Sequence, residues 1–391
     1  MLDVLMGEDI PYLWDNWDID RTQEMKMQPQ RQVLSRCCVA DGCLQLRFRT
    51  VYALGGHSTL TQDMVVYADT PRVDFETTVD WQDKHHLLKA QFLVDMKTSF
   101  SRHEIQYGYV DRPNNANTAV ERAKFEVCNH KYTDLFDTRY GVALLNDCKY
   151  GISVQGSDMR LTLHKGGCRP DPGGDIGVHD FTYALLPHDS GFSAPSVVRP
   201  AYELNMKPLC VPAALEEPEE PPITLEPSNL IVESIKPAED GDGCVVRFYD
   251  SECTTSRAKL RLRLPVRRVA ETNMLEDEIA ELPLRDGETC TRCGAPEVAF
   301  TGTGCDLRQA VSVTPAAGEP VVLTTVTAVQ TVPEREEGRR PSLVMRRLAA
   351  DETLWDAAKQ YRTDEELIRA VNQLTEGEVP DKMLLIPRMR P

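Results

Sequence analysis

Three short stretches of the sequence carry the side chains best suited to chemistry on a polar substrate. The first places two tryptophans and two aspartates close together at Trp14, Asp15, Trp17 and Asp18. Aromatic rings can stack on the C–H faces of sugars, and carboxylates accept hydrogen bonds from hydroxyl groups. The pattern therefore predicts a sugar-facing wall. The alternative is a tryptophan pair that packs against the start of a β domain.

The second stretch, residues 125–151, is the most distinctive part of the chain. Its apolar run from Val142 to Leu145 precedes Asn146 and Asp147, as expected of a buried strand that ends at a turn. Asn146 and Asp147 could reach a sugar across a domain interface, or they could simply cap the turn. His130 lies in the loop of the same stretch and is a further candidate, with a hydrogen-bonded structural histidine as the alternative.

The third stretch is a Gly/Pro-rich loop, RPDPGGDIGVHD, that contains Asp171, Asp175 and His179. Functional side chains are often carried by loops, so these three residues are predicted to contact substrate. A flexible turn without function is the alternative. The neighbouring pair His85 and His86 is interpreted instead as ordinary histidines of a sheet.

No complete set of metal ligands is evident in the sequence. Cys290 and Cys293 form one CxxC pair and Cys305 lies a little further on, but a structural zinc site normally needs four ligands, and no fourth ligand has suitable spacing. The alternative for the CxxC pair is two loop thiols. The twelve cysteines are spread over a long chain without an export signal. Free thiols in a reducing, cytoplasmic environment are therefore expected, and no cofactor is expected in this chain.

The elements that must position these residues are strands. From Arg31 to about His188, apolar and polar residues alternate with period two and are separated by turn sequences such as Asp41-Gly42. This alternation is typical of antiparallel strands with one face on a core and one in water. No convincing amphipathic helix is expected before residue 350. The prediction is a mainly β chain whose largest part is an antiparallel β-sandwich.

Composition excludes several classes of partner. The formal net charge is −17, whereas phosphate binding needs clustered lysine and arginine, so neither a nucleic acid nor an anionic membrane surface is expected. No apolar run approaches 18 residues, which predicts no transmembrane helix. The N-terminal residues lack the basic and long apolar regions of a signal peptide.

Changes in composition divide the chain. Residues 1–212 form the expected large sandwich, and an acidic, Pro-rich linker, AALEEPEEPP, follows it. Residues 223–288 predict a smaller β module, and residues 289–335 a strand-rich connecting segment. Residues 341–391 predict a small β-α-α-β domain, in which Thr363 and Glu366 would form a capping box at the start of the second helix.

Seven phrases, which occur in order along residues 10–287, resemble the C-terminal β region of glycoside hydrolase family 38 α-mannosidases of the bacterial and cytosolic type. They are WDNWDID, VDFETTVDWQDKHHLLK, EIQYGYVDRP, FEVCNHKYTDL, YGVALLNDCKYG, HDFTYALLPH and ETNMLEDE. One departure is NTAVERAKFEV at residues 117–127, where that family would place a Trp-Asp pair after the Asn-Thr.

The resemblance implies an α-mannoside ligand and a loop at residues 169–180 that approaches the active site. It also implies that zinc, the aspartate nucleophile and the general acid belong to an N-terminal α/β barrel and the helical domain after it. We therefore expect a catalytically incomplete chain that contributes to the substrate site, with a separate barrel domain as a possible partner.

The C-terminal residues resemble a lysin motif (LysM): DETLWDAAKQYRTDEELIRAVNQL is followed by MLLIPR. The preceding strand-rich stretch is similar to the region before lysin motifs in spore-coat-associated proteins. This resemblance implies binding of N-acetylglucosamine polymers. The sequence leaves three functions open: the β portion of an α-mannosidase, a non-catalytic glycan- or peptidoglycan-binding protein, or a truncated fusion without independent function.

Overall fold

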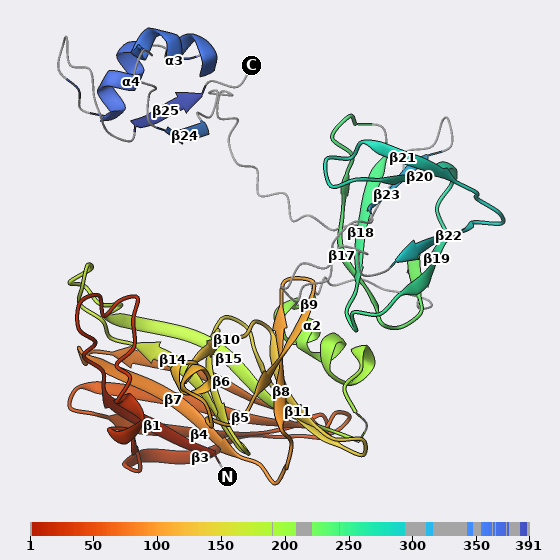
Figure 1. Ribbon diagram of the computed structural model, residues 1–391. Helices are drawn as coiled ribbons and strands as arrows, with labels where there is room; N and C mark the ends of the chain where they lie inside the picture. Colours follow the sequence, from red (N-terminus) through yellow and green to blue (C-terminus); the bar gives the residue numbers. More distant parts are fainter. Residues whose placement is uncertain are drawn as a thin grey trace. The chain divides into compact units, whose positions relative to one another are not determined.

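The computed structural model describes residues 2–189, 191–208, 221–241, 243–293, 310–315, 342–346, 353–361, 363, 365–372, 374 and 384–388. The chain divides into two compact units, Met1–Thr324 and Thr325–Pro391. The first unit contains the large sandwich and the smaller β module, and the second contains the small α/β domain (Figure 1).

The larger sheet of the sandwich has nine described strands, all paired antiparallel. In sheet order they are β3 (Val33–Asp41), β4 (Gln45–Leu54), β5 (Ser58–Tyr67), β6 (Val73–Trp81), β15 (Gly177–His188), β12 (Gly141–Asn146), β11 (Tyr132–Phe136), β8 (Phe100–Ile105) and β9 (Gly108–Pro113). The predicted alternation is plain in β6, where Phe75, Thr77, Val79 and Trp81 are buried and the residues between them from Glu76 onward are exposed.

The second sheet of the sandwich has six described strands. In sheet order they are β10 (Val127–Cys128), β13 (Gly151–Gln155), β14 (Asp158–Lys165), β7 (His86–Leu93), β1 (Leu2–Glu8) and β2 (Gln28–Pro29). Side chains of both sheets share one core, in which Phe75 contacts Phe92 with ring centroids 5.6 Å apart. Two antiparallel sheets around a common core confirm the predicted β-sandwich.

The described chain contains helical segments before residue 350, where no convincing amphipathic helix was expected, and the segment η2–α2 contradicts that expectation. They are the 3₁₀ turn η1 (Gln23–Met25), α1 (Ala119–Ala123), the π-helical segment η2 (Ala194–Val198) and α2 (Arg199–Asn205). A capping box between Ser193 and Ser196 begins η2. A helical spacing of apolar residues then buries Ala194, Val197, Val198, Ala201 and Leu204. The apolar spacing was visible in the sequence, whereas Ser196 is not the Glu or Gln that marks a capping box.

The smaller β module contains two further antiparallel sheets. One has the order β16 (Ile223–Glu226), β19 (Ser256–Leu262), β22 (Glu288–Cys293), and the other has the order β17 (Leu230–Pro237), β18 (Cys244–Asp250), β23 (Ala310–Pro315), β20 (Val266–Thr272), β21 (Glu278–Leu282). Strand β23 belongs to the segment expected to connect domains, yet it is the middle strand of its sheet, between β18 and β20.

The second unit has the expected β-α-α-β order. Strand β24 (Ser342–Arg346) pairs antiparallel with β25 (Leu384–Arg388), and α3 (Leu354–Tyr361) and α4 (Glu365–Asn372) lie between them in the sequence. The predicted capping box at Thr363 is wrong, because the Thr363 hydroxyl is buried without a hydrogen-bond partner. Thr353 and Asp356 exchange these bonds at the start of α3 instead. No helix in the described ranges is both long and apolar enough to cross a membrane.

Candidate functional site

Three loops that are far apart in the sequence meet at one end of the sandwich. They follow β1 (residues 9–20), join β6 to β7 (residues 82–85) and join β14 to β15 (residues 166–176). Backbone hydrogen bonds tie them together: Asn16 N donates to Arg169 O at 2.9 Å, and His85 N donates to Gly166 O at 2.6 Å. The first and third predicted stretches therefore belong to one site, which we call the loop end.

The two tryptophans are exposed at the loop end. Trp14 and Trp17 are 48% and 75% exposed, and their ring centroids lie 5.8 Å apart. They are not part of the sandwich core, which argues against the alternative in which they only pack the start of the domain. Asp18 is also exposed, and its Oδ1 accepts a hydrogen bond from Ile19 N at 2.9 Å.

Asp15 differs from its neighbours because its side chain is buried between the loops. Its Oδ1 accepts a hydrogen bond from Arg169 N at 2.6 Å, and its Oδ2 lies 3.0 Å from Nδ1 of His85. Burial alone would raise the pKa of Asp15, but backbone hydrogen bonds at Cys168 and Arg169, together with His85, lower that pKa below its ordinary value. Asp15 thus orders the loops as a carboxylate.

The third predicted stretch supplies polar groups beside the tryptophans. Asp171 is exposed, its Oδ1 accepts from Gly173 N at 2.8 Å, and its own backbone N donates to Asn16 Oδ1 at 3.3 Å. Asp175 is exposed and has a left-handed φ of 51°. Its carbonyl oxygen lies 2.7 Å from Nε2 of His179. The structure therefore brings Asp171 and Asp175 to the loop end. His179, which was expected in the same loop, lies on β15 instead, and its ring packs against His164 with centroids 4.5 Å apart.

Exposed apolar side chains surround these polar groups. On the two adjacent loops and the start of β15 they are Ile10, Tyr12, Leu13, Trp14, Trp17, Ile176 and Val178, which we call the apolar rim. Single exposed apolar residues are ordinary, but a group of them bordered by polar residues marks a surface that meets another molecule or domain. The apolar rim therefore marks the loop end as an interaction surface.

The residues predicted in the central stretch have clear structural contacts. Asn146 is fully buried, its Nδ2 donates to His130 O at 2.6 Å and its Oδ1 accepts from Lys149 N at 2.8 Å. Asp147 accepts from Thr182 N at 2.9 Å, and the His130 ring packs edge-on against Tyr150. Asn146 thus caps the turn, and contact of these residues with a sugar stays a prediction.

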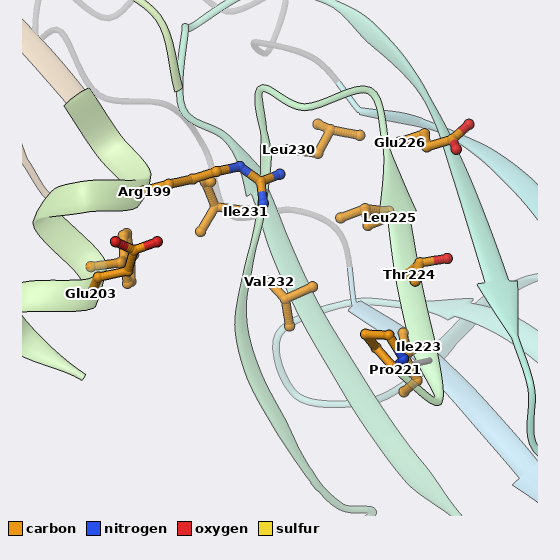
Figure 2. Close-up of a pocket in the computed structure, with 11 residues that line it drawn as sticks. Arg199, Glu203, Pro221, Ile223, Thr224, Leu225, Glu226, Leu230, Ile231 and Val232 are labelled. Carbon is orange, nitrogen blue, oxygen red and sulfur yellow. The ribbon is translucent and has the colours of Figure 1, made fainter. Parts of the chain in front are cut away.

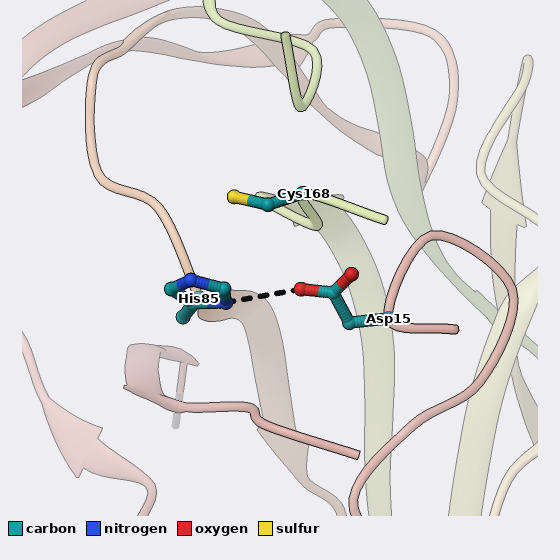
Figure 3. A group of neighbouring side chains, drawn as sticks. All are labelled: Asp15, His85 and Cys168. Atoms are coloured by element: carbon teal, nitrogen blue, oxygen red, sulfur yellow. Dashed lines mark hydrogen bonds and ion pairs between the residues drawn. The ribbon is translucent and has the colours of Figure 1, made fainter. Parts of the chain in front are cut away.

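Two loop-end groups were missed in the sequence. His85 belongs to the pair interpreted as ordinary sheet histidines, yet it precedes β7 with a left-handed φ of 57° and contacts Asp15. Asp15, His85 and Cys168 come from three different loops, and their potential metal-ligand atoms lie within 4.8 Å of one another (Figure 3). The sequence offered only a histidine and a cysteine next to turns, without ligand spacing.

A cavity of about 590 Å³ lies elsewhere in the first unit, between α2 and the strands β16 and β17. Arg199 and Glu203 of α2 face the apolar side chains of Leu225, Ile231 and Val232 (Figure 2). Its lining includes Arg199, Tyr202 and Glu203 but no residue that the sequence predicted for the site, so the loop end remains the candidate site.

Among the described cysteines, Cys253 departs from the expectation of free thiols. Eight described cysteines are free, including Cys168 and Cys290, whereas Cys253 is disulfide-bonded. Cys290 and Cys293 lie on strand β22 rather than in a loop. Cys305 lies outside the described residues.

Two family models match this chain. Residues 3–173 match the glycosyl hydrolases family 38 C-terminal domain, and residues 229–309 match the family 38 C-terminal β-sandwich domain. Alpha-mannosidase 2C1 of Homo sapiens is 34% identical over 72% of this chain, and Alpha-mannosidase G of Dictyostelium discoideum is 33% identical over 70%. This chain spans only 28% and 26% of those two relatives, respectively.

A solved structure shows the same fold. The crystal structure of an alpha-mannosidase from Enterococcus faecalis V583 superposes with a TM-score of 0.63 at 14% identity, and the match covers 80% of this chain and 38% of that one. The two family models lie in the expected order on the sandwich and the smaller module. This chain therefore contains the C-terminal β region of the family 38 glycosyl hydrolases.

Proposed function

We propose that the chain is the β portion of an α-mannosidase and that its loop end forms one wall of the substrate site. The observation that carries this proposal is that the loop of the exposed pair Trp14 and Trp17 is hydrogen-bonded, through Asn16, to the loop of the exposed Asp171, within the apolar rim. Aromatic faces and hydrogen-bonding side chains are what a sugar requires. The apolar rim supplies the surface against which a catalytic domain would pack.

In this proposal the remainder of the enzyme supplies the bond-breaking groups. Retaining glycosidases need two carboxyl groups about 5–5.5 Å apart on either side of the scissile bond, and we assign them, with the zinc ion, to a barrel domain. The Asp15–His85–Cys168 group is not assigned to that zinc, because it belongs to the β region. This chain's share is to stack on the sugar, orient its hydroxyls and exclude water.

Removing both loop-end tryptophans tests this role. The full-length chain is mixed with the barrel-bearing part of the enzyme, and hydrolysis of an aryl α-mannoside is followed with added zinc. The variant Trp14→Ala with Trp17→Ala should lower kcat/KM about 10- to 100-fold, since two stacking contacts of about 1 kcal/mol or more are lost. Leu275→Ala, at an 81% exposed leucine outside the apolar rim, is the matched control.

Two outcomes would contradict the proposal. Turnover by this chain alone, well above a mock preparation, would mean that it holds its own catalytic groups. Unchanged kcat/KM in the double tryptophan variant, with normal assembly, would mean that the loop end does not contact substrate.

We also propose that the second unit binds glycans rich in N-acetylglucosamine. The pairing of β24 with β25 around α3 and α4 supports this, because it is the arrangement that the lysin-motif resemblance implies. The loops expected to form its groove, after Leu348 and at residues 372–377, lie largely outside the described residues.

A pull-down assay tests this second role. Full-length chain should be retained on insoluble peptidoglycan and on chitin but not on cellulose, and deletion of residues 341–391 should abolish retention. Retention that survives this deletion would assign binding to another part of the chain. A chain that neither binds glycan nor supports mannoside hydrolysis would favour the truncated-fusion alternative.

A further inference from the structure

Three potential ligands of different chemical types converge at the loop end, and one of them, Asp15, lies between Trp14 and Trp17 in the sequence. Asp15 offers a carboxylate oxygen, His85 a ring nitrogen and Cys168 a thiol sulfur, and these atoms all lie within 4.8 Å of one another. Figure 3 shows the three side chains arriving from three separate segments. Asp15 and His85 lie 70 positions apart in the sequence, so the fold rather than local sequence creates the group.

The distances suit a small transition-metal ion. Bond lengths of about 2.0–2.3 Å place neighbouring ligands of a tetrahedral zinc ion about 3.3–3.7 Å apart. The Asp15 Oδ2 to His85 Nδ1 distance is 3.0 Å, and the remaining pairs, within 4.8 Å, would need shifts of about 1 Å or less. We propose that Asp15, His85 and Cys168 bind one divalent ion of the zinc class.

The ligand types select the ion. Thiolate and imidazole ligands favour zinc and cobalt, whereas magnesium and calcium prefer sites made of oxygen atoms. Asp15 is held for binding by Arg169 N, which donates to the carboxylate oxygen that does not face His85. His85 has 44% of its side chain exposed, which leaves an entry path and room for water as a fourth ligand.

Metal binding changes which atoms of the three ligands carry protons. The Cys168 thiol loses its proton to solvent, because the thiolate is the metal ligand. The hydrogen bond between His85 and Asp15 is replaced by two metal bonds, and the neutral His85 ring then carries its proton on Nε2. The ion would thereby hold together the loops that present Trp14 and Trp17, so the site stabilises the wall assigned to it under the proposed function.

Cobalt provides a direct readout. Full-length chain is stripped with a chelator, dialysed and titrated with Co²⁺, and thiolate-to-cobalt charge-transfer absorption is recorded. We expect saturation near one ion per chain, displacement by Zn²⁺ and no displacement by Mg²⁺ or Ca²⁺. Cys168→Ser should abolish the charge-transfer band, and His85→Gln should weaken binding more than about 100-fold, since even outer-shell losses cost 10- to 100-fold.

Matched variants separate this site from other thiols and histidines. Cys290→Ser removes the free thiol of the CxxC pair, Cys148→Ser removes an exposed thiol, and His86→Gln removes the adjacent exposed histidine. All three should bind Co²⁺ like the original chain. Circular dichroism of Cys168→Ser and His85→Gln confirms that they remain folded.

Either of two results overturns the proposal: no band at any Co²⁺ concentration, or a band that survives Cys168→Ser. In the second case, loss of the band in Cys290→Ser would move the metal to the CxxC pair. Because the readout is metal binding rather than turnover, its failure leaves the mannosidase assignment standing, and failure of the mannoside assay leaves the metal site standing.

Discussion

Replacing Lys89 with alanine is expected to destabilise the sandwich by about 3–5 kcal/mol, which is the typical cost of removing one partner of a buried ion pair. Lys89 lies on β7, which pairs with β14 on one side and β1 on the other. Its ammonium group contacts the Glu126 carboxylate, and the two side chains are only 1% and 7% exposed. Without Lys89, the carboxylate would keep a hydrogen bond from Thr162 but no counter-charge.

A double variant shows whether the loss comes from the stranded charge. Lys89→Met with Glu126→Leu removes both charges and keeps similar volumes, so it should recover most of the stability, because apolar replacements of buried ion pairs are often neutral or stabilising. Urea unfolding, followed by the fluorescence of the buried Trp81, measures each variant. Equal losses in the single and double variants would mean that packing, rather than charge, dominates.

An exposed ion pair provides the control for this measurement. Glu239, whose side chain is 79% exposed, contacts Lys236, and Lys236 also contacts Glu276. Glu239→Ala should cost far less stability than Lys89→Ala, because exposed ion pairs contribute little and Lys236 keeps its second partner. A Lys89→Ala variant that loses no more stability than Glu239→Ala would contradict the buried-pair argument.

The ion pair between Lys89 and Glu126 also shows what the sequence could not predict. Alternation in β6 predicted which of its side chains face the core, and that expectation was correct. In β7, however, the run Leu87, Leu88, Lys89 and Ala90 is buried throughout. Period-two reasoning would place such a lysine in water, and its partner comes from residues 117–127, the stretch that departs from the family pattern. Only the tertiary structure brings the two charges together.

The loop end has the same limitation. Residue types alone indicated Trp14, Trp17, Asp171 and His179, because aromatic and polar groups in loops are unusual enough to attract attention. That Trp14, Trp17 and Asp171 lie on adjacent loops depends on how β1, β7 and β14 pair, which no local pattern states. His179 lies on β15 rather than on a loop. His85 was assigned to a sheet because the neighbouring apolar run is a strand. The helix α2 was overlooked because strand patterns dominate the residues before it.

Lowering the pH from 7 to 5 is expected to cost the sandwich about 4 kcal/mol through two buried histidines. Burial lowers the pKa of His103 to about 3, with a smaller contribution from Arg112. Burial likewise lowers the pKa of His164 to about 3, and the nearby His179 and Lys149 add to this effect. Both imidazoles therefore stay neutral in the folded chain while the unfolded chain takes up protons below pH 6.5.

The direction of this effect follows from proton uptake. Because the unfolded state binds more protons, stability is complete above the unfolded pKa near 6.5 and falls as the pH drops toward 3, by about 2 kcal/mol per histidine at pH 5. Asp63 and Asp83 also have lowered pKa values, caused by Arg49 for Asp63 and by hydrogen bonds with Ser58 and Gly56, which outweigh burial, for Asp83. Their contribution is lost only below about pH 4. Burial raises the pKa of Asp134, although His188 opposes this, so this carboxyl acts in the opposite direction, and the histidine variants are needed to isolate the two imidazoles.

Urea unfolding at several pH values, comparing the original chain with two glutamine variants, tests this account. His103→Gln removes a ring whose nitrogens lie 2.8 Å from Ser101 Oγ and 3.1 Å from Thr133 Oγ1, and His164→Gln removes the ring beside Trp81. We expect each variant to be less stable at pH 7 than the original chain. The fall in its unfolding free energy between pH 7 and 5 should be about half that of the original chain. His57→Gln, at an exposed turn, controls for the loss of an imidazole. A decrease in stability that is unchanged in both variants would place the acid sensitivity elsewhere. The reason is that glutamine, unlike histidine, takes up no proton when the chain unfolds at pH 5.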